Sequence, residues 1–449
     1  MRKPRSFHPL ALAAAALCLA GPAAAQSTLT GFALMPANTT SDGPTSGQFA
    51  GPGAGGNALP LVNLQPVQGV STILNGPTAG TYTVMTDNGF GAQNNSADAL
   101  LRLYTLRPDW RTGSGGTGAV TPVDFITGAA LPTFSAASRV TLSDPDRKLG
   151  YAIQADFINY YNNAANPAVD PALRAGRWLT GADLDTESAR RDKNGNFWFG
   201  DEFGPFLVKT NASGVVLSRE VRVPGVQSPQ SPYLNGAAPT LGSSRGFEGM
   251  AVNAAGDRLY TLLEGTVTGD AARTLRINEF NVDTEAFTGA QWLYTLEAQG
   301  TAIGELTAIS DTQFLVIERN GATATGGGTP FKKIFKVDFT QLDASGRLVK
   351  TEIVDLMNIA DPDDLNGDGS TVFTFPYVTI ESVLILDANT LLVVNDNNFP
   401  GTGGRLPGVS DPTEFLRIRL ASPVPEPGTW ALFAAGLAAM GGLMRRRKA

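Results

Sequence analysis

One pattern recurs along this chain and limits the folds open to it. A glutamate opens a short apolar run, a turn follows, and a second apolar run ends in acidic or amide residues. The clear copies span residues 187–202, 248–264, 305–320 and 381–398, and a weaker copy at 68–88 starts with Gln68 instead of glutamate. Two short apolar runs around a turn predict a β-hairpin. A hairpin that recurs roughly every 50 to 80 positions predicts a β-propeller, with one unit in each blade.

Further strand-like segments extend most of these hairpins. They lie at residues 206–210, 274–280, 333–338 and 414–420, and long amphipathic helical patterns are scarce. We therefore predict an all-β chain, a β-propeller of six or seven blades, with an N-terminal signal helix and a C-terminal hydrophobic helix. Residues 107–180 are irregular and are compatible with one further blade or with a long insertion.

The acidic residues stand at the open ends of the hairpins. The first residue of strand one lies opposite the last residue of strand two, so these acids meet away from the turn. Inner strands that face a central channel would gather them around one mouth, whereas in a β-sandwich they would be solvated strand ends. From the propeller we predict these metal ligands: Glu187, Asp201, Glu202, Glu248, Glu264, Glu305, Glu318, Glu381, Asn395, Asp396 and Asn397.

The only histidine and the only cysteine, His8 and Cys18, both lie in the first 25 residues. A body without either excludes a Ser-His-Asp triad, a phosphohistidine, a thiol nucleophile, a disulfide and a histidine or cysteine zinc site. A bound metal must then have oxygen ligands, which favours calcium or magnesium. A ring of carboxylates also needs cations to offset its repulsion, so we predict several Ca²⁺ ions.

Both ends of the chain read as export signals. Arg2, Lys3 and Arg5 precede an apolar run and a small-residue cleavage site, which predicts a signal peptide over residues 1–25. Residues 422–449 place Val-Pro-Glu-Pro before an apolar stretch and four terminal basic residues. This order resembles the PEP-CTERM sorting signal, which implies export through the inner membrane, transient anchoring by the C-terminal helix and processing by exosortase-type machinery. The protein is then periplasmic, at the cell surface or secreted.

The body between these signals, residues 26–421, is acidic. It carries 27 basic and 40 acidic side chains, a net charge of −13. Such a surface attracts cations and excludes nucleic acid as a partner. We expect this body to be a monomer.

The order of several motifs resembles a known family. Residues 181–192, 197–207, 245–251, 380–386 and 394–400 are similar to the phytase-like family, described as esterase-like activity of phytase, over roughly Gly69 to Leu420. The resemblance implies a propeller and calcium-dependent hydrolysis of a small phosphate ester. A metal-activated water would attack phosphorus at the acidic mouth. The candidate catalytic residues are Glu248, Arg245, Arg190 and Arg319, the arginines contacting phosphate oxygens.

A second function stays open at this point. The sorting tail and the Gly- and Asn-rich loops are equally typical of a non-catalytic, calcium-stabilised propeller that binds an extracellular polymer such as exopolysaccharide or a surface partner. The two hypotheses differ in turnover, since only the hydrolase requires a reacting ester.

Overall fold

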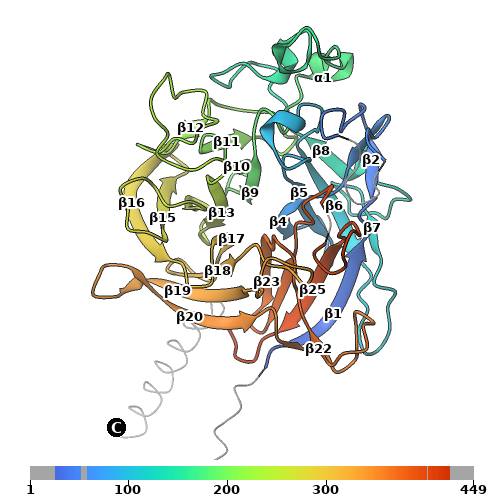
Figure 1. The fold of residues 1–449 in the computed structure, drawn as a ribbon, viewed down its shortest axis with the longest axis vertical. Helices are drawn as coiled ribbons and strands as arrows, with labels where there is room; N and C mark the ends of the chain where they lie inside the picture. Colours follow the sequence, from blue (N-terminus) through green and yellow to red (C-terminus); the bar gives the residue numbers. More distant parts are fainter. Residues whose placement is uncertain (1–25, 52–57, 402, 425–449) are drawn as a thin grey trace, which may run out of the picture.

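The computed structural model describes residues 26–51, 58–401 and 403–424. Across these residues the chain forms five mainly antiparallel sheets around a central axis, as Figure 1 shows. The innermost strands are β4 (Val70–Asn75), β9 (Thr186–Arg191), β13 (Phe247–Val252), β17 (Ala302–Ala308) and β23 (Ser382–Asp387). Each contacts the next, and β23 contacts β4, so the ring closes. The predicted all-β propeller is confirmed.

Each sheet is a blade that grows outward from its inner strand. Blade 1 continues with β5 (Tyr82–Thr86), β6 (Arg102–Pro108) and β7 (Val120–Pro122), and β8 (Arg139–Thr141) also pairs with β6. Blade 2 continues with β10 (Phe197–Asp201), β11 (Phe206–Thr210) and β12 (Val221–Arg222). Blade 3 continues with β14 (Arg258–Leu263), β15 (Thr274–Asn281) and β16 (Ala286–Thr295). Blade 4 continues with β18 (Gln313–Arg319), β19 (Lys332–Leu342) and β20 (Leu348–Asp355).

Blade 5 is completed by the N-terminal end of the described chain. Beyond β23 lie β24 (Thr390–Val394), β25 (Thr413–Arg419) and then β1 (Thr28–Met35), which pairs with β25 in antiparallel register. The short strands β21 (Ile359–Ala360) and β22 (Val372–Phe373) extend this sheet. One sheet therefore holds both ends of the described chain, and it closes the ring.

The prediction of six or seven blades is wrong, because the described chain has five. The irregular region after β6 supplies β7, β8 and a peripheral segment with the short helix α1 (Pro171–Gly176) and the 3-10 turns η3 (Ala136–Ser138), η4 (Gln154–Asp156) and η5 (Tyr160–Asn162). Its buried side chains, including Leu149, Ile153 and Leu173, pack onto the layer between blades 1 and 2. A segment that buries its apolar residues in this way needs no blade of its own. The hairpin of β2 (Thr40–Asp42) and β3 (Leu64–Pro66) and the turn η2 (Gln93–Asn95) are also additions to the blades.

The hydrophobic core is divided into layers between neighbouring blades. Five clusters of buried residues each join one blade to the next, including blade 5 to blade 1. Trp198 of blade 2, for example, packs with Phe280 of blade 3 at a ring-centroid distance of 4.9 Å. Because both faces of each sheet are covered, the central strands read as nearly continuous apolar runs rather than as an alternating pattern. These layers fix the inner hairpins relative to one another.

The hairpin turns follow directly from local side-chain chemistry. Between β9 and β10, Asp192 accepts hydrogen bonds from the backbone N–H groups of Asn194 and Asn196 at 2.8 and 3.0 Å. Gly195 in this turn has φ +81°, a conformation in which a side chain is strained. Asn253 accepts from the backbone of Asp257 in the same way between β13 and β14. These turns set each hairpin's register and the position of its open end.

Two predicted helices lie outside the described residues. The signal peptide over 1–25 is one, and the C-terminal hydrophobic helix within 422–449 begins beyond Val424, where the description ends. Among the residues that are described, α1 is six residues long, and none of the helices has the length and hydropathy needed to cross a membrane.

We predict that weakening β1 destabilises the whole propeller. Leu29 is almost fully buried in the layer between blades 4 and 5, so Leu29→Ala should lower the free energy of unfolding by about 2–5 kcal/mol. Urea unfolding of residues 26–421 measures this change. Thr28→Ala, a partly exposed neighbour on the same strand, is the control and should cost less than about 1 kcal/mol. Equal effects of the two substitutions would contradict the closing role of β1.

Candidate metal centre

A one-residue bulge marks the open end of the inner hairpins. The strand register skips one residue at Ser71 in blade 1, Glu187 in blade 2, Glu248 in blade 3 and Gly304 in blade 4. In blade 5, Glu381 comes just before the first paired residue of β23, and its N–H donates to the carbonyl oxygen of Val394 at 3.3 Å. A bulge re-aims the extra residue and is common beside functional sites. These five residues are therefore equivalent positions around the axis.

The second strands supply a matching set of positions. In each hairpin, the first paired residue after the bulge position has a partner on the second strand. The residue two positions beyond that partner is Asp87 in blade 1, Glu202 in blade 2, Glu264 in blade 3, Arg319 in blade 4 and Asp396 in blade 5. Four of these five residues are acidic. Together with the bulge residues they form the open ends of all five inner hairpins.

The glutamates at these positions converge into two groups. Carboxylate oxygens of Glu187, Glu248 and Glu381 lie within 4.8 Å of one another and form the first triad. Oxygens of Glu202, Glu248 and Glu264 do the same and form the second triad. Glu248 belongs to both triads, and all five side chains are buried. Blades 2, 3 and 5 thus bring carboxylates to one place.

The electrostatics of these groups are unfavourable without a cation. Burial, then the charge of Glu264, raises the pKa of Glu248 to about 8. Burial also raises the pKa of Glu187 and of Glu381 well above the ordinary value, with further contributions from neighbouring carboxylates. Burial and Glu264 do the same to the pKa of Glu202. In this structure the carboxylates resist ionisation, so full ionisation requires added positive charge.

Three further acids join these glutamates. Burial raises the pKa of Asp87, of Asp185 and of Asp396, and each also interacts with acids of this group. We call the whole set the carboxylate ring: Asp87, Asp185, Glu187, Glu202, Glu248, Glu264, Glu381 and Asp396. Two arginines contact it. Arg319 Nη2 lies 2.9, 3.2 and 3.1 Å from Glu248, Glu264 and Glu381, and Arg245 Nη1 lies 2.6 Å from Glu264.

The ring fits a divalent cation with oxygen ligands. The ligand atoms that the two triads offer are carboxylate oxygens, which calcium and magnesium prefer. Glu202 Oε1 is buried and has no hydrogen-bond partner within the described part of the chain, although a buried carboxylate oxygen ordinarily has one. If all eight acids of the ring were ionised, Arg245 and Arg319 would offset only two of the eight negative charges. We interpret the ring as a candidate metal centre.

Glu305 does not join the ring. It follows the bulge residue Gly304 by one position, so its side chain takes the other face of the strand. Its carboxylate accepts the backbone N–H of Leu306 at 2.8 Å and pairs with Arg190 at 2.8 Å. Arg190 also borders a cavity of about 190 Å³ toward the turn ends of the inner strands. The structure thus places Arg190 and Glu305 together, away from the two triads.

Three other predicted ligands, Asp201, Glu318 and Asn395, each lie one residue before the equivalent second-strand position of their blade. Asp201 accepts the backbone N–H groups of Asp185 and Gly204 at 2.8 and 2.6 Å. Glu318 accepts from Tyr294 Oη at 2.6 Å and pairs with Lys350 at 2.7 Å.

The amides of blade 5 are engaged in a similar way. Asn395 accepts the backbone N–H of Glu414 at 2.7 Å. Asn397, one residue beyond Asp396, donates to Gln68 at 2.7 Å and accepts the backbone N–H of Gly69 at 3.2 Å. These side chains join local backbone segments or neighbouring blades rather than the triads.

The prediction omitted two members of the ring. Asp87 ends the second strand of the weak copy in blade 1, and the glutamine at the start of that copy hid the equivalence. The true equivalent of the glutamates there is Ser71, whose hydroxyl donates to Glu381 at 3.0 Å. Asp185 lies two residues before Glu187 and accepts a hydrogen bond from Asn88 at 2.7 Å. The sequence signal that could have identified Asp87 is its position at the end of the second strand of the hairpin, where the other copies also carry an acid.

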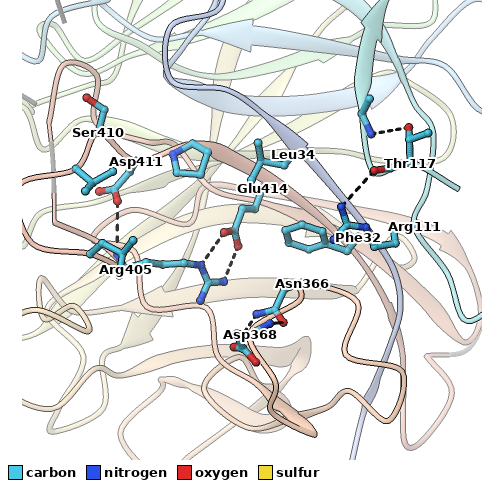
Figure 2. Close-up of a pocket in the computed structure, with 15 residues that line it drawn as sticks. Phe32, Leu34, Arg111, Thr117, Asn366, Asp368, Arg405, Ser410, Asp411 and Glu414 are labelled. Atoms are coloured by element: carbon cyan, nitrogen blue, oxygen red, sulfur yellow. Dashed lines mark hydrogen bonds and ion pairs between the residues drawn. The ribbon is translucent and has the colours of Figure 1, made fainter. Parts of the chain in front are cut away.

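A separate cavity of about 840 Å³ lies between the outer part of blade 5, including β1, and the segment that joins β6 to β7 in blade 1. Figure 2 shows Arg405 bonded to Glu414 through two nitrogens, at 2.6 Å each. The cavity is lined by Phe32, Leu34, Arg111, Thr117, Gly118, Ala119, Asn366, Asp368, Arg405, Leu406, Val409, Ser410, Asp411, Pro412 and Glu414. None of these residues belongs to the carboxylate ring.

Comparisons with known proteins agree with the motif order. Residues 65–399 match the family described as esterase-like activity of phytase, and residues 423–448 match the PEP-CTERM protein-sorting motif. A protein described as an uncharacterized secreted protein from Arthroderma benhamiae is 25% identical over 160 residues, which is 29% of this chain and 30% of that one. The match therefore spans under a third of the relative.

Solved structures are more distant. A luciferin-regenerating enzyme is 11% identical with a TM-score of 0.36, covering 81% of this chain and 84% of its own. A calcium-binding protein, regucalcin, from Agrobacterium tumefaciens is 14% identical with a TM-score of 0.35, at 81% and 94% coverage. A periplasmic gluconolactonase from Pseudomonas aeruginosa is 14% identical with a TM-score of 0.30, at 87% and 99% coverage. Scores this low carry no argument about function.

We predict that, in the presence of a chelator, the free energy of unfolding of residues 26–421 decreases as the pH rises from about 5 to about 7. The folded state raises the pKa of Glu248 from 4.5 to about 8 and that of Asp201 from 3.8 to about 8, chiefly through burial. The folded protein therefore binds more protons than the unfolded chain in this range, and rising pH favours unfolding. Burial lowers the pKa of Lys332 to about 7. Above about pH 7 the folded state therefore loses a proton that the unfolded chain keeps, and this opposes the loss of stability caused by the acids.

Thermal melts in EDTA at several pH values measure this trend. Added calcium should raise the melting temperature more at pH 7 than at pH 5, since the metal replaces bound protons. A melting temperature in EDTA that climbs across this range would contradict the prediction.

Proposed function

Because the chain belongs to the family described as esterase-like activity of phytase, we propose that it is an exported, calcium-dependent phosphoric-ester hydrolase that acts at the carboxylate ring. The observation that carries the proposal is the sharing of Glu248 by two buried carboxylate triads. The glutamates of the two triads would hold divalent cations through their carboxylate oxygens. A site of this kind receives phosphate oxygens, which an uncompensated acidic surface would repel.

The residues that would hold calcium are the five glutamates of the triads, with Asp87, Asp185 and Asp396 beside them. Bound calcium would supply Lewis-acid chemistry, polarising a phosphate ester and lowering the pKa of a water molecule. The chain's own contribution is positional. The bulges aim the glutamates inward, and Ser71 orients Glu381 through its hydroxyl.

Among the predicted arginines, Arg245 is best placed to meet the substrate. Its side chain is 45% exposed, and one guanidinium nitrogen bonds to Glu264 of the second triad. The exposed face of the guanidinium can then contact a phosphate oxygen, a geometry that arginine favours. Arg319, at 9% side-chain exposure, is already held by three glutamates. We therefore assign phosphate recognition to Arg245 alone.

We propose that this activity is carried out after export and sorting, outside the cytoplasm. The PEP-CTERM motif implies processing by exosortase-type machinery. We propose transient anchoring through the C-terminal segment, with a small phosphate ester, phytate among the candidates, as the substrate reached after export. A monomeric body is sufficient for this chemistry, since all members of the ring come from one chain.

A non-catalytic propeller is the second candidate. The ring glutamates are at most 9% exposed, which gives a bound ester little carboxylate surface to approach. The cavity of about 840 Å³ at the edge of blade 5 is apart from the ring and has the size of a small-ligand site. In this alternative, calcium stabilises the fold and an extracellular polymer such as exopolysaccharide binds elsewhere.

Phosphate release separates the two candidates. Residues 26–421 with calcium should liberate inorganic phosphate from a generic phosphate monoester or from phytate, and EDTA should abolish the release. The assay is colorimetric phosphate detection over a panel of esters. No release from any ester, with calcium-dependent retention on exopolysaccharide, would overturn the hydrolase proposal and favour the binding protein.

Glu248→Gln tests the shared carboxylate. It removes a charged ligand from both triads, so kcat/KM should fall about 10²-fold or more and calcium should bind less tightly. Glu305→Gln is the matched control, a buried glutamate of the next blade outside both triads, and should keep the calcium affinity. Steady-state kinetics and calcium titration of folded protein measure both. Equal losses in the two variants would remove Glu248 from its proposed role.

A further inference from the structure

Blade 4 breaks the pattern of the carboxylate ring. The bulge position that holds a serine or a glutamate in the other four blades is Gly304, and the matching second-strand position is Arg319 instead of an acid. A Cβ atom at Gly304 would lie 2.0 Å from the carbonyl oxygen of Ile380, so no side chain fits there. Blade 4 therefore contributes no carboxylate at either position, and it contributes the ring's most buried cation.

Arg319 reaches across to the acids of its neighbours. A single nitrogen, Nη2, lies within 3.2 Å of Oε1 atoms of Glu248 and Glu264 from blade 3 and of Glu381 from blade 5. Glu381 belongs to the first triad, Glu264 to the second, and Glu248 to both. Calcium binds oxygen at about 2.3–2.6 Å, so three oxygens around one nitrogen at about 3 Å need to move inward by only about half an ångström to hold an ion. The guanidinium thus occupies a point that suits a metal.

We propose that Arg319 is a built-in cation that takes the place of one divalent ion in the carboxylate ring. The ring then binds about two ions, one for each triad, and Arg319 holds the shared Glu248 between them. The inference rests on the metal-binding part of the proposed function and not on hydrolysis. Arg319 is a positioning residue and sets the number of ions.

The same chain offers a matched control. Arg190 is also a buried arginine of an inner hairpin, and it pairs with the buried glutamate Glu305. Glu305 also accepts hydrogen bonds from the backbone N–H groups of Leu306 and Met250, and among the described residues no second carboxylate pairs with Arg190. Loss of Arg190 leaves one glutamate, Glu305, without its arginine. Loss of Arg319 leaves three glutamates without theirs, and the carboxylates of these three already surround one point.

The test compares Arg319→Gln with Arg190→Gln and Arg319→Lys, each prepared as residues 26–421 with calcium present. Metal analysis and calorimetric titration give the number of calcium ions per chain, and melting temperatures are taken in EDTA and in calcium. Arg319→Gln should gain about one ion over the roughly two of the unmodified protein, since a ligand set of three carboxylates is freed. Its melting temperature should fall in EDTA and recover in calcium.

Arg190→Gln should melt lower in both solutions and keep the original number of ions. Arg319→Lys keeps the positive charge and should also keep that number. The inference is overturned if Arg319→Gln gains no ion, if it fails to fold even in calcium, if Arg319→Lys gains an ion as well, or if the unmodified protein binds no divalent ion. Calcium binding with the expected gain but without ester hydrolysis would refute the proposed function and leave this inference standing.

Discussion

Repulsion among buried carboxylates is the constraint around which this molecule is organised. Acids from blades 2, 3 and 5 meet within 4.8 Å of one another, where burial makes each charge costly. The chain offsets this cost in part with Arg319, whose single nitrogen bonds glutamates of two blades. The remaining imbalance, together with the unpartnered Glu202 Oε1, is what links the fold to a divalent cation.

The propeller makes such a centre possible because the contacts that keep the blades rigid lie outside the carboxylate ring. Hydrophobic layers between neighbouring blades hold the five inner hairpins at fixed separations, and β1 completes the last blade. Burial of the apolar side chains in these layers supplies stability, which offsets the destabilising repulsion within the cluster of like charges. The bulges then turn Glu187 and Glu248 inward without changing the rest of the strand pairing. A site of strained electrostatics can persist only on a support of this kind.

The structure brings some of the predicted ligands together and separates others, and the bulges account for several of the separated ones. Glutamates that open a hairpin at a bulge, such as Glu248, were found from the repeat alone. Glu305 was aligned with them by residue type, but the bulge residue in its blade is Gly304, and a shift of one position reverses the face of a strand. Asp201 and Glu318 were misplaced by one residue for the same reason. Bulge positions depend on packing between blades, which a pattern of residue types does not record.

By itself, the sequence determined the all-β repeat, the sorting motif and the restriction to oxygen ligands, because these follow from hairpin periodicity and from residues that are present or absent along the chain. Only the tertiary structure decided that the blades number five, that the N-terminal strand closes the ring, and that Arg319 stands among the acids of blades 3 and 5. Those facts depend on contacts between residues far apart in the chain. Packing between distant segments determines these features, because local strand and turn propensities are satisfied whichever arrangement forms.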